Sequence, residues 1–484
     1  MSPQFTRVLC ASFLTGALAV LVLLSGCGTK NPALTSAKIY IGLTPPDYDK
    51  ATEQLLLAIQ KDSLSGEAHL LLGKIYGQKK MHQEMLAQFQ KAETCKLTPE
   101  QAEEIKQLKT RTWTEVLNSG IDLGRRSKQV DRYQLDLLTD FSKYPQYKDS
   151  LKIMSQGLPD GDKLTWDGYK TYGEAKPALE QLGRMLDQKA VEHYQLAIQI
   201  DSTRYEPYVN LAADYVHKDE LERALGYYAQ AYQLKPDDSN VMNDYAVTLL
   251  RAQKFDQALG LYDRILEKDP ANVNALVNLA MIYAREGETD KAQETYSKIV
   301  SIDPEYKDAY FNRGLLYLSQ SQELMPVLKA YQDSVENNKK NQEFASRYQS
   351  AWEEYERLFL KAESDFRKTA EIDANDKDAS FHLGLLYVGR AQIQTEKDRQ
   401  SADFGQAETL FSKGLEIDPE DIETLKYLGF TLIRLGKWQE ATLPLEKVVE
   451  IDPTDREAWK YLAIAYANLK KKDLAEQALK KSAR

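Results

Sequence analysis

Side chains that could perform catalysis are present in this chain, but none has a partner at the spacing that catalysis requires. The five histidines are scattered through 484 residues, and no pair shows the H-E-x-x-H spacing of a zinc-binding helix. No glycine-rich loop is followed by Lys-Ser or Lys-Thr to bind phosphate, and no G-x-S-x-G turn presents a nucleophilic serine. The formal net charge of −10 argues against nucleic acid as the main partner. The sequence therefore predicts no enzyme, no cofactor, no metal site and no small-molecule substrate.

One cysteine stands where a covalent modification is predicted. Residues 8–24 form an apolar run after the single charge of Arg7, and the run ends in the sequence L-S-G-C at Cys27. This ending resembles the lipobox of bacterial lipoproteins, in which the signal is cut before the cysteine and acyl chains are attached to it. The resemblance implies a signal peptide over residues 1–26, a lipidated Cys27 and, because Gly28 follows, an outer-membrane anchor that faces the periplasm. The alternative is an uncleaved signal anchor.

Residues 205–306 repeat one pattern three times at a spacing of 34 residues. Each copy has a small residue, then an alanine, a tyrosine and a proline: Ala212, Ala224, Tyr228 and Pro236; Ala246, Ala258, Tyr262 and Pro270; Ala280, Ala292, Tyr296 and Pro304. Small residues let two helices approach closely, large residues at helical spacing fill the space between neighbouring pairs, and the proline ends the second helix. The pattern therefore predicts stacked pairs of helices.

This period resembles that of the tetratricopeptide repeat, a helix-turn-helix unit. The resemblance implies an all-α, right-handed superhelical solenoid that binds other proteins or peptides and does no chemistry itself. The expected domains are then a tether (27–48), a divergent helical region (49–200) in which one helix ends near Asn118, three regular repeats (205–306), a repeat with an insertion at about 318–361 (307–376), a repeat with a shorter insertion (377–421), and two final repeats (422–484).

The longer insertion has an apolar pattern of its own. Leu324, Leu328, Tyr331 and Val335 step by four, three and four residues before a polar turn, and heptad spacing resumes from Phe344 after it. Heptad spacing on both sides of a turn predicts a helical hairpin with an antiparallel coiled-coil seam. The alternative is a polar insertion without fixed structure.

Asparagines recur at the positions of the first helices that line the concave face in proteins of this repeat family. They are Asn210, Asn240, Asn243, Asn274, Asn278 and Asn312. Because an amide side chain can donate and accept at once, a series of them could hold the backbone of an extended peptide. The alternative is that these side chains only support the neighbouring turns.

Farther along, the residues expected on this face become aromatic and basic: Phe311, Phe381, Tyr427, Phe430, Lys426 and Arg434. The rings could pack against a ligand and the cations could meet carboxylates; the alternative is that most of these residues are packed or solvated. The sequence thus predicts an acylated scaffold that binds peptides or helical segments of envelope proteins through a concave groove. A second hypothesis is an assembly component of an envelope secretion or pilus machine, similar to lipidated pilotins, with the 318–361 hairpin as its docking element.

Overall fold

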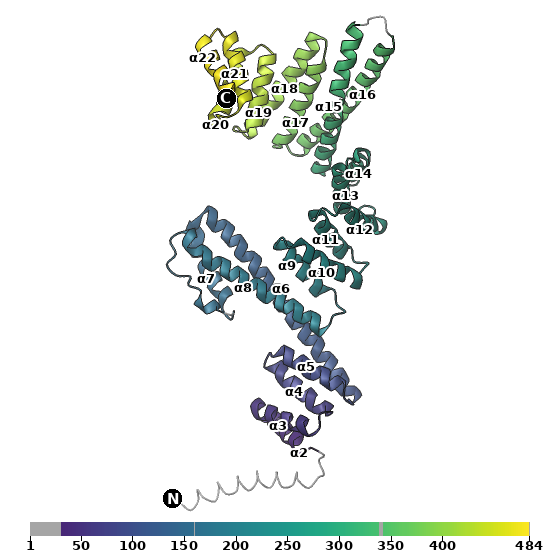
Figure 1. Cartoon of the computed structure of the whole chain (residues 1–484), viewed down its shortest axis with the longest axis vertical. Coiled ribbons are helices and arrows are strands. Elements are labelled where there is room, and N and C mark those ends of the chain that lie inside the picture. The colour runs from purple at the N-terminus through teal and green to yellow at the C-terminus, as the bar shows by residue number, and fades with distance from the viewer. Residues whose placement is uncertain (1–30, 159, 338–341, 484) are drawn as a thin grey trace, which may run out of the picture. The chain divides into compact units, whose positions relative to one another are not determined.

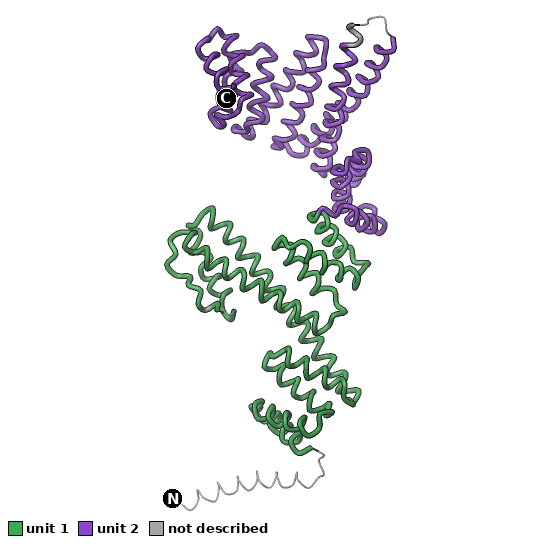
Figure 2. The backbone as a smooth tube through the Cα atoms, in the orientation of Figure 1, with its two compact units in different colours: residues 1–252 green, residues 253–484 purple. Residues whose placement is uncertain are grey.

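The protein is described as a computed structural model over residues 31–158, 160–337 and 342–483. These residues form 21 α-helices and no strand, so the prediction of an all-α fold built from helix pairs is confirmed. The signal peptide and Cys27 lie outside the described residues. Within the part of the chain that is described, no helix is both long and apolar enough to cross a membrane. The chain divides into two compact units between Ala252 and Gln253 (Figure 2).

Unit 1 contains ten helices among its described residues. They are α2 (Pro32–Ile41), α3 (Tyr48–Lys61), α4 (Gly66–Gln78), α5 (His82–Glu93), α6 (Pro99–Thr139), α7 (Tyr144–Ser155), α8 (Tyr172–Ile200), α9 (Glu206–His217), α10 (Leu221–Leu234) and α11 (Ser239–Arg251). Consecutive helices pack as antiparallel pairs, and α6 packs along α8 (Figure 1).

Unit 2 contains eleven helices over the residues described. They are α12 (Phe255–Lys268), α13 (Val273–Arg285), α14 (Thr289–Ile302), α15 (Lys307–Asn337), α16 (Gln342–Ile372), α17 (Lys377–Ile393), α18 (Lys397–Ile417), α19 (Ile422–Arg434), α20 (Trp438–Ile451), α21 (Arg456–Asn468) and α22 (Lys472–Ser482). Figure 1 shows α15 to α18 side by side.

Acidic and amide side chains fix where many first helices begin. The side chains of Asp376, Asp421 and Asp455 each accept a hydrogen bond from the backbone N–H three residues later, at the starts of α17, α19 and α21. Asn272 does the same for α13. Such caps satisfy backbone donors that have no partner within the helix, so they fix the residue at which each of these helices begins.

Close contacts between small residues and rings hold each pair together. A Cβ added to Gly384 would lie 2.4 Å from Cε1 of Phe411, and one added to Gly73 would lie 2.5 Å from Cε1 of Phe89. In the three regular repeats the alanines at this position, Ala212, Ala246 and Ala280, are 0% exposed. The small residues therefore lie at helix crossings, as the repeat pattern predicts.

The same kind of contact shows how the second half of the divergent region (49–200) is built. A Cβ on Gly120 of α6 would lie 2.8 Å from the ring of Tyr194 in α8. Gly73 and Phe89 are 16 residues apart, whereas Gly120 and Tyr194 are 74 apart. Helices α6 and α8 are thus the first and second helices of one repeat, lengthened by an insertion that contains α7. The prediction that a helix ends near Asn118 is wrong, because α6 continues without a break to Thr139.

The expectation of an irregular tether over residues 27–48 also needs correction. Residues 32–41 form α2, which begins after the capping residue Asn31 with proline in its first turn. Ala33 and Ala37 are buried in the apolar cluster that includes Leu55 of α3. Six of the ten residues of this helix are apolar, but the prolines at positions 32, 45 and 46 favoured a loop, so the helix was missed. Its buried face is formed by the two small alanines.

The insertions of unit 2 form helical hairpins, and the prediction of a hairpin insertion is confirmed. The hairpin of α15 and α16 packs beside the lengthened hairpin of α17 and α18. Tyr355 and Phe359 of the first hairpin share one buried cluster with Leu386 and Phe404 of the second. The two insertions therefore support one another, which their separate positions in the sequence do not indicate.

Candidate functional site

In unit 2 a row of aromatic rings crosses α15, α17, α19 and α21, each of which is the first helix of its helix pair. We call this row the aromatic surface. Phe311 of α15 lies 5.3 Å from the ring of His382, and His382 lies 5.3 Å from its neighbour Phe381 on α17. Phe381 in turn lies 5.7 Å from Tyr427 of α19 in an edge-to-face arrangement. All four side chains are half-buried. The structure thus brings together three residues that the sequence analysis selected from helices far apart in the chain, and each ring keeps part of its surface open.

The aromatic surface continues onto α21 beside a small hollow. Phe430 of α19 lies 5.5 Å from Tyr461 of α21. The hollow has a volume of about 180 Å³, and it is lined by Gln392, Lys426, Tyr427, Phe430, Glu457 and Tyr461. Sites for drug-sized molecules measure about 300–1,000 Å³. The hollow is therefore large enough for one side chain of a larger ligand and too small for most cofactors.

The polar groups around this hollow are tied to one another. The Tyr461 hydroxyl donates to Glu457 Oε1 over 2.9 Å, and burial together with this bond raises the pKa of Tyr461. Lys426 donates to Glu423 Oε1 over 2.9 Å and to Asp455 Oδ2 over 3.3 Å. Burial alone would lower the pKa of Lys426, but these two carboxylates outweigh it and the pKa is raised. The charge of Lys426 is thus already matched within the chain.

The other predicted cation of this surface also has an intramolecular contact. Arg434 is exposed, and its guanidinium lies 5.4 Å from the ring centre of Phe404. Phe404 in turn contacts Phe430 with ring centres 6.3 Å apart. Arg434 therefore extends the aromatic surface by a cation–π contact.

The predicted asparagine series is split between the two units. Asn210, Asn240 and Asn243 belong to unit 1, whereas Asn274, Asn278 and Asn312 belong to unit 2. Asn240 and Asn274 are exposed and the other four are half-buried. Asn210 Nδ2 donates to the backbone oxygen of Glu206 over 2.8 Å. At Asn210 the amide therefore supports its own helix, which is the local role that the sequence left open.

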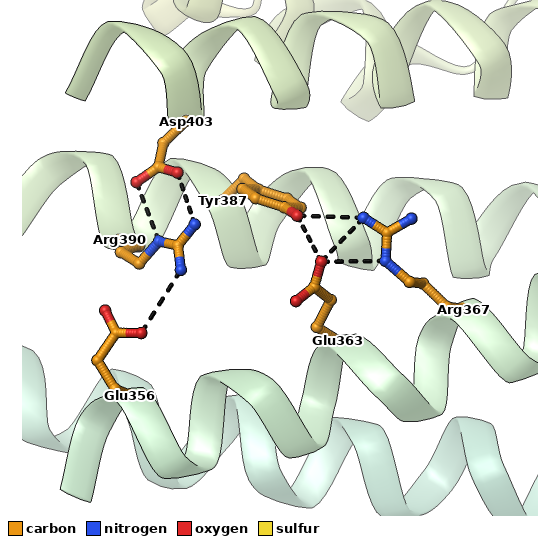
Figure 3. Close-up of polar contacts among 6 residues, drawn as sticks. All are labelled: Glu356, Glu363, Arg367, Tyr387, Arg390 and Asp403. Carbon is orange, nitrogen blue, oxygen red and sulfur yellow. Dashed lines mark hydrogen bonds and ion pairs between the residues drawn. The ribbon is translucent and has the colours of Figure 1, made fainter. Parts of the chain in front are cut away.

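An ion-pair network joins the insertions next to the aromatic surface (Figure 3). Arg390 of α17 donates from Nε and Nη2 to the two oxygens of Asp403 of α18, over 3.0 and 2.7 Å. Its Nη1 lies 3.5 Å from Glu356 of α16, and its guanidinium lies 3.7 Å from the ring centre of Phe359. We call these four residues the Arg390 network. It holds three helices of the two hairpins in one arrangement.

A second cross-helix network lies nearby. Tyr387 of α17 donates to Glu363 of α16, and Arg367 donates to the same carboxylate over 2.8 Å (Figure 3). A separate ion pair joins α15 to α16, where Arg313 donates to both oxygens of the buried Asp365 over 2.8 and 2.7 Å. Sequence analysis missed these residues, because a charged residue on a helix gives no sign of which partner it meets across a hairpin.

Comparison with known proteins supports the repeat assignment for part of the chain. Residues 215–267 and 249–312 match the family model of the tetratricopeptide repeat. These matches span less than half of the 484 residues, so tetratricopeptide repeats are shown for this segment. A search of curated proteins gave no match.

Several solved structures resemble the fold. A tetratricopeptide repeat protein from Parabacteroides merdae is 20% identical, covering 58% of this chain and 99% of that one, with a TM-score of 0.37. PilF from Pseudomonas aeruginosa is 13% identical over 54% of this chain and 98% of its own, also with a TM-score of 0.37. PilW, described as a type IV pilus biogenesis factor, is 18% identical over 50% and 90%, with a TM-score of 0.34. At these identities the similarity concerns the fold alone.

Proposed function

We propose that this protein is a non-enzymatic scaffold that binds peptides or helical segments of other envelope proteins on the aromatic surface of unit 2, which is formed by α15, α17, α19 and α21. The observation that carries the proposal is the row formed by Phe311, Phe381, Tyr427, Phe430 and Tyr461. These rings come from four different helices and stay half-exposed beside a hollow that fits one side chain. Half-exposed aromatic rings supply large contact areas at low entropic cost, and they are enriched at the centres of protein interfaces.

Selection of random peptides displayed on phage, against the full chain, tests this function. Peptides that contain a large apolar or aromatic residue should be enriched. Phe381→Ala and Tyr461→Ala should each weaken their binding by about thirtyfold, because removing a central ring from an interface costs about 2 kcal/mol. The matched control is Leu443→Ala, since Leu443 is 69% exposed on the second helix α20 and lies outside this surface.

The outcome that would overturn the proposal is equal binding by all three variants. Far-ultraviolet circular dichroism of each variant would show whether the helices are retained. A loss of binding by Leu443→Ala as large as that by Tyr461→Ala would place the interface on the other side of the hairpins.

The proposed address is the periplasmic side of an outer membrane, with acyl chains on Cys27 as the anchor. The support is the apolar run of residues 8–24 and the L-S-G-C sequence that ends it. Growth with an alkyne-labelled fatty acid should label the full-length protein, and Cys27→Ser should remove both the label and the membrane association. Cys95, the free cysteine of the described residues, gives the control variant Cys95→Ser, which should keep both. Label retained by Cys27→Ser would contradict the anchor.

The assembly-component hypothesis receives support from one feature, the Arg390 network. A hairpin that docks into a larger machine gains from being rigid before it binds, and the network fixes the hairpin of α15 and α16 to that of α17 and α18. Shortening the hairpin by removing residues 322–354 tests this role. Binding of the selected peptides should survive, whereas assembly of the machine should fail; normal assembly would remove the hypothesis.

A further inference from the structure

Unit 1 has a pocket that is separate from the aromatic surface. Its volume is about 580 Å³, and it lies between α6, α8 and α9. The residues that the argument uses are Arg125, Lys128 and Arg132 of α6, Tyr194 of α8, and Asn210 and Asp214 of α9. Helix α6 continues beyond the length of the first helix in an uninterrupted repeat. Lys128 and Arg132 lie on these added turns.

The base of the pocket carries a carboxylate that is not fully paired. Asp214 is only 5% exposed, and its Oδ2 has no hydrogen-bond partner among the described residues. Its nearest cation, Lys128, lies 3.9 Å from Oδ1, at the long end of an ion pair. Burial raises the pKa of Asp214, and Lys128 only partly opposes this effect. A buried carboxylate oxygen without a donor is costly, so the site favours a ligand that supplies one.

Asp214 belongs to a series of acceptors on one face of α9. Glu206, Asn210 and Asp214 are each four residues apart, and in the described part of the chain Glu206 Oε2 is also buried without a partner. Four residues of helix rise about 6 Å. An extended peptide places every second side chain on one side at intervals of about 6.6 Å. The two spacings match closely enough for alternate residues of a peptide to face successive acceptors.

The wall of the pocket that α6 forms is basic. Lys128 and Arg132 stand one turn apart on α6, and the side chain of Lys128 is half-exposed. Arg125 lies one turn before them and pairs with Asp122 of its own helix. The pocket therefore offers hydrogen-bond acceptors on α9 and cations on α6.

We propose that this pocket binds an extended peptide in which a lysine or arginine is flanked by acidic residues. The basic side chain reaches Asp214 and gives the free Oδ2 its donor. The side chains before and after it point away from Asp214, because successive residues of an extended chain alternate, and they meet the exposed cations of the pocket, Arg125 and Arg132. The proposal rests on the proposed function in taking a peptide as ligand, but it uses a site in the other unit.

Charge order along the peptide is the property that tests this proposal. The probes are fluorescein-labelled peptides Gly-Gly-Glu-Lys-Glu-Gly-Gly and Gly-Gly-Lys-Glu-Lys-Gly-Gly, measured by fluorescence anisotropy against the full chain. The first should bind at least about tenfold more tightly than the second, since the second directs a carboxylate at Asp214. Equal binding of the two peptides, or no binding of either, would overturn the proposal.

Two variants separate recognition from folding. Asp214→Asn should weaken binding of the Glu-Lys-Glu peptide by at least about tenfold while the protein stays folded, because the amide keeps the shape and removes the charge. Arg132→Gln should weaken binding less and flatten its salt dependence, since Arg132 is exposed. Unchanged affinity in Asp214→Asn would refute the role of this carboxylate. Equal competition by free spermidine would refute the peptide in favour of a small cation.

The result can be separated from that of the aromatic surface. Phe381→Ala should bind the Glu-Lys-Glu peptide as the native chain does, because Phe381 belongs to unit 2. If phage-selected peptides bind and the Glu-Lys-Glu peptide does not, only this further inference fails. If Phe381→Ala abolishes binding of both, the pocket of unit 1 is not the site.

Discussion

Replacing Arg390 tests whether the Arg390 network holds the two hairpins of unit 2 together. Arg390→Met keeps most of the side-chain volume over Phe359 but leaves Asp403 and Glu356 without their shared cation. The side chain of Asp403 is 8% exposed and that of Glu356 is 31% exposed, so the first of these carboxylates bears most of the loss. Breaking a buried ion pair on one side costs about 3–5 kcal/mol. We expect the lower end, about 3 kcal/mol, because Arg390 itself is 20% exposed.

A local measurement is needed because a repeat array of this length does not unfold in one step. Hydrogen exchange, followed by mass spectrometry of fragments from α17 and α18, reports opening of this hairpin alone. A loss of about 3 kcal/mol corresponds to about a hundredfold rise in the open population. The matched control is Arg399→Met: Arg399 is 68% exposed and pairs with Glu396 within one turn, so its removal should change exchange very little.

The double variant Arg390→Met, Asp403→Leu completes the test. Removing both charges should restore most of the protection, because the cost comes from leaving one charge buried alone and not from losing the pair. The reasoning would be refuted if Arg390→Met exchanged no faster than Arg399→Met. It would also be refuted if the double variant were less protected than the single one, because Asp403 would then have another role.

Two further predictions concern small changes whose direction the structure fixes. Gly384→Ala should destabilise the hairpin of α17 and α18 by about 1–3 kcal/mol, since its Cβ would lie 2.4 Å from Phe411. Gly405→Ala, whose Cβ would meet nothing within 4 Å outside its own stretch of helix, should stabilise the same hairpin by about 0.5–1 kcal/mol, and hydrogen exchange of fragments from α17 and α18 measures both changes. Equal effects would contradict the close crossing. Asp214→Asn should raise the Tm of unit 1 at pH 7 by about 2–4 °C. Folding raises the pKa of Asp214, so the stability that this group contributes is fully present below its pKa in the unfolded chain and is lost as the pH rises through its pKa in the folded chain. At pH 7 the native chain therefore carries a buried charge that the variant lacks. Calorimetry should show this advantage disappearing towards pH 4, and a variant less stable than the native chain at pH 7 would refute the argument.

The repeated part of the fold could be predicted because the same set of packing residues recurs several times in the sequence. A small residue, an alanine and a large ring recur at fixed spacing, and each such set must form one helix crossing. The aromatic surface could be predicted from the same alignment of the repeats. Once the small residue of each first helix is known, the positions beside it in successive repeats are expected on one face of the solenoid. Phe311, Phe381 and Tyr427 could thus be grouped before any distance was known.

The polar networks could not be predicted in this way. Arg390 meets Asp403 only because an insertion lengthens α17 and α18 together, and the partner of a charge across a hairpin depends on the insertion length and on the loop between the helices. The pairing of Gly120 with Tyr194 was hidden for a similar reason. Ala190, Tyr194 and Ala197 have the pattern of a second helix, but 74 residues separate Gly120 from Tyr194 where 16 are usual. Searching for a first helix far upstream of an orphan second helix would have found it.

The insertions share one position in the repeat, and this position links fold to function. Gly120 and Tyr194, Gly314 and Phe366, and Gly384 and Phe411 each keep their close contact although 74, 52 and 27 residues separate them. Each insertion thus enters between the first and second helix and lengthens both, leaving the crossing unchanged. The basic wall of the pocket in unit 1 and the Arg390 network both stand on helix added in this way. The crossing thus recurs in every one of these repeats, whereas the added turns carry charges that the uninterrupted repeats lack at the same place. If the proposed binding of peptides is correct, we expect selectivity between partners to come from the lengthened hairpins.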